Sequence, residues 1–271
     1  MIEKKKMFYP SIGESWGILG ITILSMLLFS PVNLVLDHLI GKEISFLVYY
    51  VIAIGVPFLI AHRIRHKKTG VNTYPLRFSS IKIMVLIAIS TIAIQFGITS
   101  PIVNSLPMPE FMKQLFLEFA NQNGLFSFIA IVIAAPILEE LIFRGIILNG
   151  LLQKYSPVKS IMISSVLFGL VHLNPWQFVS ALIIGLFSGW VYYKTRKLTL
   201  PILIHLMNNL FAFVGMYFMD AETMMNETLP ELYGGFTNLI LIVIGAIAVS
   251  ILGVFLLSKE FKRLKIDEWQ H

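Results

Sequence analysis

The segment of residues 125–152 has the sequence LFSFIAIVIAAPILEELIFRGIILNGLL. A bilayer core of about 30 Å requires roughly 20 consecutive apolar residues in a helix, and this segment exceeds that length. Its only charged side chains are Glu139, Glu140 and Arg144. A charged side chain at the centre of a membrane helix costs about 2.5 to 3.5 kcal/mol. The segment therefore predicts a transmembrane helix whose charged side chains face the protein interior, pair with one another or line water.

Apolar segments of similar length recur along the whole chain of 271 residues. They cover about 16–40, 44–62, 81–103, 158–174, 177–193, 199–219 and 237–257. Hydrophobic residues make up 56% of the chain and charged residues 13%, whereas soluble domains carry about 25% charged residues. We therefore predict an all-α polytopic membrane protein with about eight transmembrane helices, which form a single membrane domain of residues 1–271. Lys4 to Lys6 precede the first segment as in a secretory signal, but that segment is too long for one and is expected to be a retained helix.

The basic residues predict the orientation of the helices, because cytoplasmic loops are enriched in Lys and Arg. With eight helices and a cytoplasmic N-terminus, 18 of the 21 Lys and Arg residues fall in cytoplasmic segments. These are Lys4, Lys5, Lys6, Arg63, Arg65, Lys67, Lys68, Arg77, Lys82, Lys154, Lys159, Lys194, Arg196, Lys197, Lys259, Lys262, Arg263 and Lys265. We therefore expect both termini in the cytoplasm. The net charge of +6 then indicates a membrane surface as the partner and not nucleic acid.

One predicted external segment, residues 110–121, places apolar side chains at helical spacing. Phe111, Met112, Leu115, Phe116 and Phe119 would share one face of a helix that is too short to span the membrane. It could lie flat on the membrane surface, or it could be an ordinary amphipathic loop helix. Both alternatives predict a helix here.

The charged residues of the 125–152 segment divide by their spacing. Glu140 and Arg144 are four residues apart, so they share a helix face in the favourable order with the acid first. The expected result is an intrahelical ion pair with a structural role. Glu139 is rotated by about 100° from Glu140 and points elsewhere. Pro136 removes a backbone hydrogen bond one turn earlier and loosens the helix where a cavity could open.

Two further segments contribute polar side chains within the membrane. Phe168 and His172 are four residues apart in the 158–174 segment, and His205 and Asn209 are four apart in the 199–219 segment. Asn208, three residues after His205, lies on nearly the same helix face and is an alternative to Asn209. The set contains a carboxylate and a histidine that could activate water, and a histidine and an amide that could donate hydrogen bonds to an oxyanion. In the sixth segment, Gly185 and Gly189 form a small-xxx-small pair, which we interpret as helix packing.

Three of these patterns together resemble a known family. Glu139-Glu140-Leu-Ile-Phe-Arg144 matches EExxxR, Phe168-Gly-Leu-Val-His172 matches FxxxH, and His205-Leu-Met-Asn-Asn209 matches HxxxN. In this order they are similar to the motifs of the CPBP family of intramembrane endopeptidases, which includes the CAAX prenyl endopeptidases and bacterial proteins linked to bacteriocin immunity. The resemblance covers residues 125–219. It implies a hydrolase in the plasma membrane of a bacterium that acts on membrane-associated or lipidated peptides or proteins.

The resemblance also implies a role for each matched residue. Glu139 and His172 would activate the attacking water, and His205 with Asn209 would stabilise the oxyanion. Glu140 and Arg144 would hold the site together. The resemblance further implies a glutamate-based site without a required metal, and the candidate ligands come from three helices with no HExxH motif. Zinc stays possible, and its ligands would then be Glu139, His172 and His205.

Two other functions remain open at this point. Buried Glu and His residues also mark the proton pathways of transporters, although the sequence shows no inverted repeat. A non-catalytic immunity or regulatory protein could also retain the same scaffold. We expect the site in a cavity among the fourth, fifth and seventh helices, reached from the cytoplasm or laterally from lipid. The sequence predicts neither the substrate nor the oligomeric state.

Overall fold

The computed structural model describes residues 8–121, 123–218, 223 and 226–269, and these residues form a helical bundle. Six helices are long and apolar enough to cross a membrane: Ile12–Ile40, Lys42–Thr69, Ile81–Asn104, Leu125–Leu151, Pro175–Thr195 and Phe236–Leu264. Two shorter apolar helices cover Pro157–Leu170 and Thr199–Gly215. Each of the eight segments expected from the sequence is therefore a helix. The chain is an all-α, multi-pass integral membrane protein.

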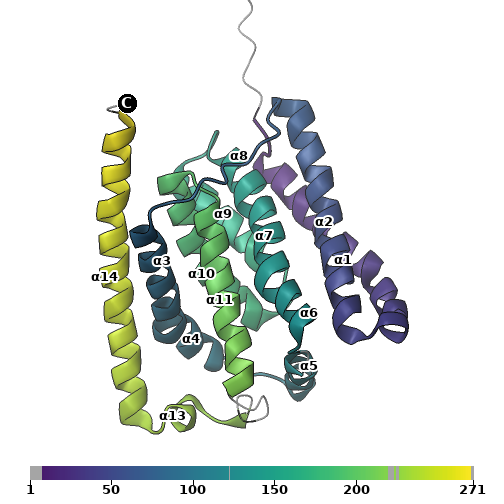
Figure 1. The fold of residues 1–271 in the computed structure, drawn as a ribbon, viewed down its shortest axis with the longest axis vertical. Coiled ribbons are helices and arrows are strands. Elements are labelled where there is room, and N and C mark those ends of the chain that lie inside the picture. The colour runs from purple at the N-terminus through teal and green to yellow at the C-terminus, as the bar shows by residue number, and fades with distance from the viewer. Residues whose placement is uncertain (1–7, 122, 219–222, 224–225, 270–271) are drawn as a thin grey trace, which may run out of the picture.

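The bundle has three parts along one direction (Figure 1). An antiparallel pair, α1 (Ile12–Ile40) and α2 (Lys42–Thr69), lies on one side. On the opposite side, α14 (Phe236–Trp269) packs against α3 (Ile81–Ile94). The central part contains the helix of residues 125–151, α9 (Pro157–Leu170), α10 (Pro175–Thr195) and α11 (Thr199–Phe218). The smaller elements are η1 (Gln95–Thr99), α4 (Ser100–Asn104), α5 (Glu110–Ala120), α6 (Leu125–Phe128), η2 (Ile129–Ala134), α7 (Ala135–Glu140), η3 (Leu141–Leu148), α8 (Asn149–Leu151) and α13 (Leu229–Leu232).

The outer face of α14 shows why lipid must surround the bundle. Leu241, Ile244 and Ile251 are each more than 60% exposed, and burial of such side chains is worth about 1.5 to 3 kcal/mol each. A continuous apolar helix face of this size is stable against acyl chains and not against water. The helix therefore confirms the composition argument at the level of individual residues.

The described ends of the chain lie at the same end of the bundle (Figure 1). At this end a connecting segment, residues 70–80, crosses the helices, and three of its carbonyl groups accept hydrogen bonds from other parts of the bundle. Arg65 Nη2 donates to the Thr73 carbonyl at 2.6 Å, Leu198 N to the Pro75 carbonyl at 2.9 Å, and Thr199 Oγ1 to the Arg77 carbonyl at 2.6 Å. Burial, together with the nearby charge of Glu14, raises the pKa of Tyr9 at this end to about 12. Its phenol therefore stays neutral at physiological pH.

The helix that carries the EExxxR pattern is irregular on both sides of its glutamates. The π-helical segment η2 precedes α7, and the π-helical segment η3 follows it. Such segments are rare and frequently occur at functional sites. Ala135 N donates to the carbonyl of Ala130, which continues the π pattern up to the residue before Pro136. The loosening expected at Pro136 therefore extends over a full turn.

The helix α9 differs from the expected span of about 158–174. It ends at Leu170 and has 14 residues, which corresponds to a length of about 21 Å at 1.5 Å per residue. This is shorter than the bilayer core of about 30 Å. His172, which we expected within a helix, therefore lies in the turn that follows α9, and that turn reaches the interior of the bundle.

Candidate active site

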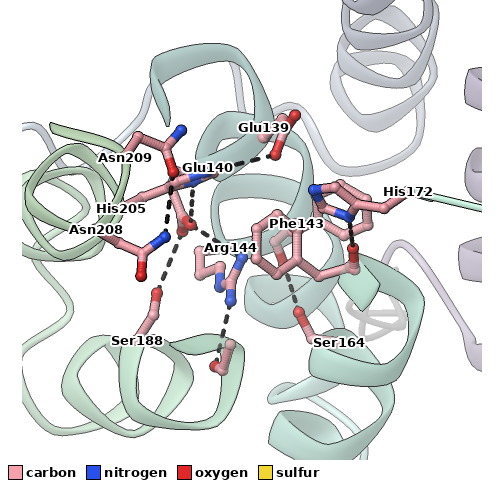
Figure 2. A network of polar contacts seen from close by, with 12 residues as sticks. Glu139, Glu140, Phe143, Arg144, Ser164, His172, Ser188, His205, Asn208 and Asn209 are labelled. Carbon is pink, nitrogen blue, oxygen red and sulfur yellow. Dashed lines mark hydrogen bonds and ion pairs between the residues drawn. The ribbon is translucent and has the colours of Figure 1, made fainter. Parts of the chain in front are cut away.

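The ion pair of Glu140 and Arg144 is the most deeply buried polar element of the site. Both side chains are fully buried, and Arg144 Nη1 lies 3.0 Å from Glu140 Oε1. Arg144 Nη2 also donates to the Gly185 carbonyl at 3.2 Å, and Ser188 Oγ donates to Glu140 Oε2 at 3.3 Å. The guanidinium carbon lies 4.4 Å from the centre of the Phe168 ring. The pair expected from the i, i+4 spacing is present, and it connects the fourth helix to α9 and α10 (Figure 2).

Glu139 points away from this pair, as the helical rotation predicts, and its two oxygens have different surroundings. Oε1 accepts a hydrogen bond from the hydroxyl of Tyr50, which lies on α2. Oε2 is buried and has no hydrogen-bond partner among the described residues. One oxygen is therefore held in place while the other stays free to accept a proton.

His205 lies between the two glutamates (Figure 2). Its Nδ1 lies 3.3 Å from Glu140 Oε1, and its Nε2 lies 3.9 Å from Glu139 Oε2. The side chain is 6% exposed. His205 is thus the histidine next to Glu139, and it links this carboxylate to the ion pair.

His172 occupies a different position from His205. Its Nδ1 lies 2.9 Å from the Phe168 carbonyl oxygen, a contact that orients the ring. The ring of Phe168 contacts both histidines, with centroid distances of 5.4 Å to His172 and 5.3 Å to His205. The next residue, Leu173, has a φ of 58°, which is an uncommon conformation for a residue with a branched side chain. The chain therefore turns sharply directly after His172.

Asn209 satisfies a backbone group that Pro136 leaves without its partner. In a π-helix the N–H of residue 136 would bond to the carbonyl of residue 131, but proline has no N–H. Asn209 Nδ2 donates to the Ile131 carbonyl at 2.9 Å, and Asn209 Oδ1 accepts from Asn208 Nδ2 at 3.2 Å. One N–H of the Asn209 amide is left for another acceptor.

A cavity of about 570 Å³ connects these residues, and its volume is within the range typical of ligand sites. Glu139, His172, His205, Asn208 and Asn209 line it. Most of the remaining wall is apolar. It comes from α1, α2, α5 and α10 as well as from the three helices expected from the sequence. Its residues include Met26, Phe46, Tyr50, Met112, Phe116, Phe119, Ile131, Phe143, Phe168 and Ile184.

The structure therefore divides the six predicted residues into two groups. It joins Glu139, Glu140, Arg144 and His205 in one network, and it places His172 and Asn209 in the wall of the same cavity with backbone partners.

Sequence reasoning missed Tyr50, Ser188 and the second role of Gly185. The Gly185–Gly189 pair does pack closely, because a Cβ on Gly189 would lie 3.0 Å from Ile161. A Cβ on Gly185 would lie 3.2 Å from Arg144 Nη2, so this glycine also makes room for the buried guanidinium. The small-xxx-small spacing was the available signal for Gly185, whereas no pattern indicated Tyr50.

The suggested zinc ligands can be compared with this geometry. Among the residues that the structure describes, no group of three or more His, Asp or Glu side chains is arranged to hold a metal ion. Glu139 and His205 face one another. His172 instead contacts the Phe168 carbonyl through Nδ1, and the Phe168 ring contacts both histidine rings. The expectation that no metal is required stays a prediction.

Comparison with known proteins places the same region in a known group. Residues 121–211 match the family described as type II CAAX prenyl endopeptidase Rce1-like. The chain is 38% identical over 82 residues to the "Putative membrane peptidase YdiL" of Bacillus subtilis, and 30% identical over 107 residues to an "Uncharacterized 24.3 kDa protein" of Escherichia coli. These matches cover 30% and 38% of this chain, and 34% and 49% of the two relatives. No solved structure matches the chain.

The matched region contains all six predicted residues, while Tyr50 and the α1–α2 pair lie outside it. Helices α9, α10 and most of α11 fall within its limits. Residues 121–211 of this chain are therefore similar to an Rce1-like domain.

Proposed function

We propose that this protein is an intramembrane endopeptidase that hydrolyses a peptide bond of a membrane-associated or lipidated peptide or protein. The observation that carries the proposal is the position of Glu139. Its carboxylate lines an apolar cavity, with one oxygen held by Tyr50 and the other without a hydrogen-bond partner. The match of residues 121–211 to the Rce1-like family and the name of the Bacillus subtilis relative support the same activity.

In the proposed reaction, Glu139 acts with His172 to remove a proton from a water molecule in the cavity. The resulting hydroxide attacks the carbonyl carbon of the scissile peptide bond, and the carbonyl oxygen becomes an oxyanion. His205 and Asn209 donate hydrogen bonds to this oxygen. The protonated acid then gives its proton to the leaving amine, so that the carboxylate is restored. The low polarity of the cavity strengthens each of these interactions.

The buried pair has a supporting role in this scheme. Arg144 fixes Glu140, and Glu140 in turn lies 3.3 Å from His205 Nδ1. This negative group holds the His205 ring with Nε2 turned toward Glu139. The Phe168 carbonyl lies against Nδ1 of His172 and favours the tautomer with a proton on that nitrogen. The orientation of both histidines thus depends on groups that do not contact the substrate.

Peptide cleavage by the detergent-purified protein tests the proposal. We expect cleavage of apolar or lipidated peptides, and we expect it to persist after treatment with a zinc chelator. Loss of cleavage with the chelator, and its recovery with added zinc, would assign a metal to the site. A wild-type protein that cleaves no member of a panel of lipidated and unlipidated peptides would contradict the endopeptidase and favour a regulatory or immunity protein.

Tyr50→Phe is expected to reduce the cleavage rate by about tenfold to a hundredfold, because a hydrogen bond to a charged group is worth about 1.5 to 3 kcal/mol. The variant keeps the ring and removes only the hydroxyl that holds Glu139. Tyr49→Phe is the matched control, since Tyr49 lines the same cavity and its hydroxyl donates at 3.1 Å to the carbonyl of Met26. Equal rates for the two variants would show that the contact with Glu139 has no role in catalysis.

Asn209→Ala is expected to lower kcat by about 10²- to 10³-fold if the amide stabilises the oxyanion. Because Asn209 also binds the Ile131 carbonyl, the thermal stability of the variant must be measured beside its kinetics. Loss of the oxyanion donor lowers kcat and leaves KM nearly unchanged. Full activity at an unchanged unfolding temperature would exclude the oxyanion role. Asn208→Ala removes only the group that donates to Asn209 Oδ1 and is expected to lower kcat less than Asn209→Ala.

A further inference from the structure

The two ends of the bundle, on either side of the candidate site, differ in how tightly they are packed. Toward the end where the chain termini lie, the fourth helix buries large apolar side chains on both sides of Arg144. Ile142, Ile146, Ile147, Leu148 and Leu151 are all 0% exposed. A Cβ on Gly150 would lie 2.2 Å from the Tyr9 carbonyl oxygen, and a Cβ on Gly145 would lie 2.9 Å from the Tyr74 ring. The main chain at Tyr9 and the ring of Tyr74 thus pack directly on the fourth helix and leave no space between the described residues at this end.

The segment of residues 70–80 adds a second layer at the closed end. The hydrogen bonds of Arg65, Leu198 and Thr199 fix it across the bundle. The Tyr74 hydroxyl lies 2.9 Å from His62 Nδ1, and its ring stacks beneath Arg65 at 4.5 Å. A substrate cannot reach Glu139 through this end without displacing a bonded segment.

The opposite end of the bundle contains the cavity of the candidate site and a second cavity next to it. The second cavity has a volume of about 670 Å³ and is formed by residues 101–108, the start of α10 and the region of α13. Phe116, Gln177 and Ser180 line both cavities. The two cavities therefore adjoin one another at this end, and these three side chains belong to the walls of both.

The helix α5 borders both cavities at this end. Met112 and Phe119 line the first cavity and Lys113 lines the second, whereas Phe111 remains 64% exposed on the outer side of the helix. A helix that packs apolar side chains against the bundle and exposes others on its opposite side lies at the boundary between the bundle and the lipid. The two cavities therefore adjoin this boundary.

The charges assign the two ends to the two sides of the membrane. The closed end carries the basic loops, whose described residues include Arg63, Lys67, Lys68, Arg77, Lys154, Lys159, Lys194 and Lys197. The end with the cavities carries Asp37, Glu43, Glu110, Glu118, Glu227 and Glu231, with Lys42 and Lys113 as its described basic residues. Because basic loops stay in the cytoplasm, the closed end is cytoplasmic and the cavities face the outside.

We propose that the site takes its substrate from the extracytoplasmic side of the membrane, and that the substrate is a peptide, or a segment of a membrane-anchored protein, exposed on the outer surface. This inference rests on the proposed endopeptidase function and excludes cytoplasmic access, which is one of the two routes, cytoplasmic or lateral from lipid, expected from the sequence. An apolar part of the substrate occupies the first cavity beside Glu139. The continuing polypeptide chain runs through the second cavity past Lys113 and Trp176.

Cysteine labelling in intact cells tests the side of the membrane independently of activity. The chain has no cysteine, so single cysteines report without background. Ser105→Cys places a thiol at the exposed edge of the second cavity, and Gln153→Cys places one in the exposed turn after α8. We expect a membrane-impermeant maleimide to label the first variant in intact cells and the second only after permeabilisation. Labelling of Gln153→Cys in intact cells, or failure to label Ser105→Cys, would overturn the assignment.

Cleavage by spheroplasts tests the side from which substrate enters. A quenched apolar peptide with a sulfonated, membrane-impermeant end group is added outside, and Glu139→Gln cells provide the blank. We expect the same cleavage rate before and after permeabilisation. Cleavage that begins only on permeabilisation would overturn external access and leave the endopeptidase standing. No cleavage even by the purified protein would instead contradict the endopeptidase, while the labelling result would still decide the orientation.

Discussion

Glu139→Gln is expected to reduce peptide cleavage by about 10²- to 10⁴-fold, the range found when a general base is removed. Glutamine has the same size and can still accept the hydrogen bond of Tyr50 through its amide oxygen. It cannot accept a proton from water at neutral pH. The variant should therefore fold, bind substrate with an unchanged KM and lose kcat. Steady-state kinetics of the purified protein measure this split directly.

Two controls make the Glu139 result specific. Glu110→Gln removes an exposed carboxylate from α5 and should leave the rate unchanged. His172→Ala should lower the rate to a similar extent as Glu139→Gln, because the two side chains are proposed to act on one water. Residues that act as a unit are not additive, so the double variant should be no slower than either single variant. Normal turnover by Glu139→Gln would rule out this carboxylate as the base and favour a non-catalytic scaffold.

The sequence was sufficient for the membrane helices because bilayer thickness sets their length and composition. All eight predicted segments are helical, and residues 110–121, which were left between two alternatives, form α5 from Glu110 to Ala120. The end of α9 could not be predicted in the same way. The apolar run continues through Val171 and Leu173, whereas α9 ends at Leu170, the chain turns at Leu173 with a φ of 58°, and α10 begins at Pro175.

For the candidate site, local spacing predicted contacts within a helix and failed for contacts between helices. The Glu140–Arg144 pair and the proximity of Phe168 and His172 follow from four-residue spacing. Tyr50 lies 89 positions from Glu139, in an apolar helix where an aromatic residue is ordinary. The placement of His205 next to Glu139 likewise depends on how α11 packs against α7. Neither the EExxxR motif nor the HxxxN motif alone therefore predicts that His205 is the histidine next to Glu139.

Arg144→Met is expected to destabilise the protein by about 3 to 5 kcal/mol, because it leaves the buried Glu140 without its partner. Glu140 is fully buried, and its remaining contacts are the Ser188 hydroxyl and His205. Methionine fills much of the space of the arginine stem, so the loss reflects the unpaired charge more than a cavity. Thermal unfolding of the purified protein in detergent, followed by protease resistance, measures the change.

The matched double variant separates charge from packing. Glu140→Gln combined with Arg144→Met removes both charges, and replacement of a whole buried pair is often close to neutral. The double variant should therefore be more stable than Arg144→Met alone. Lys82→Met is the control for a surface ion pair. It breaks the pair of Lys82 with Glu260, in which the lysine side chain is 63% exposed, and should leave the stability nearly unchanged.

The cleavage rate of the double variant shows whether the Glu140–Arg144 pair affects catalysis only by stabilising the fold. His205 Nδ1 depends on Glu140 for its orientation, so a stable double variant should still cleave slowly. If the double variant were as active as the wild type, the pair would be a structural element of the bundle with no influence on catalysis. A stable but slow double variant would instead show that the buried charge orients the histidine that faces Glu139.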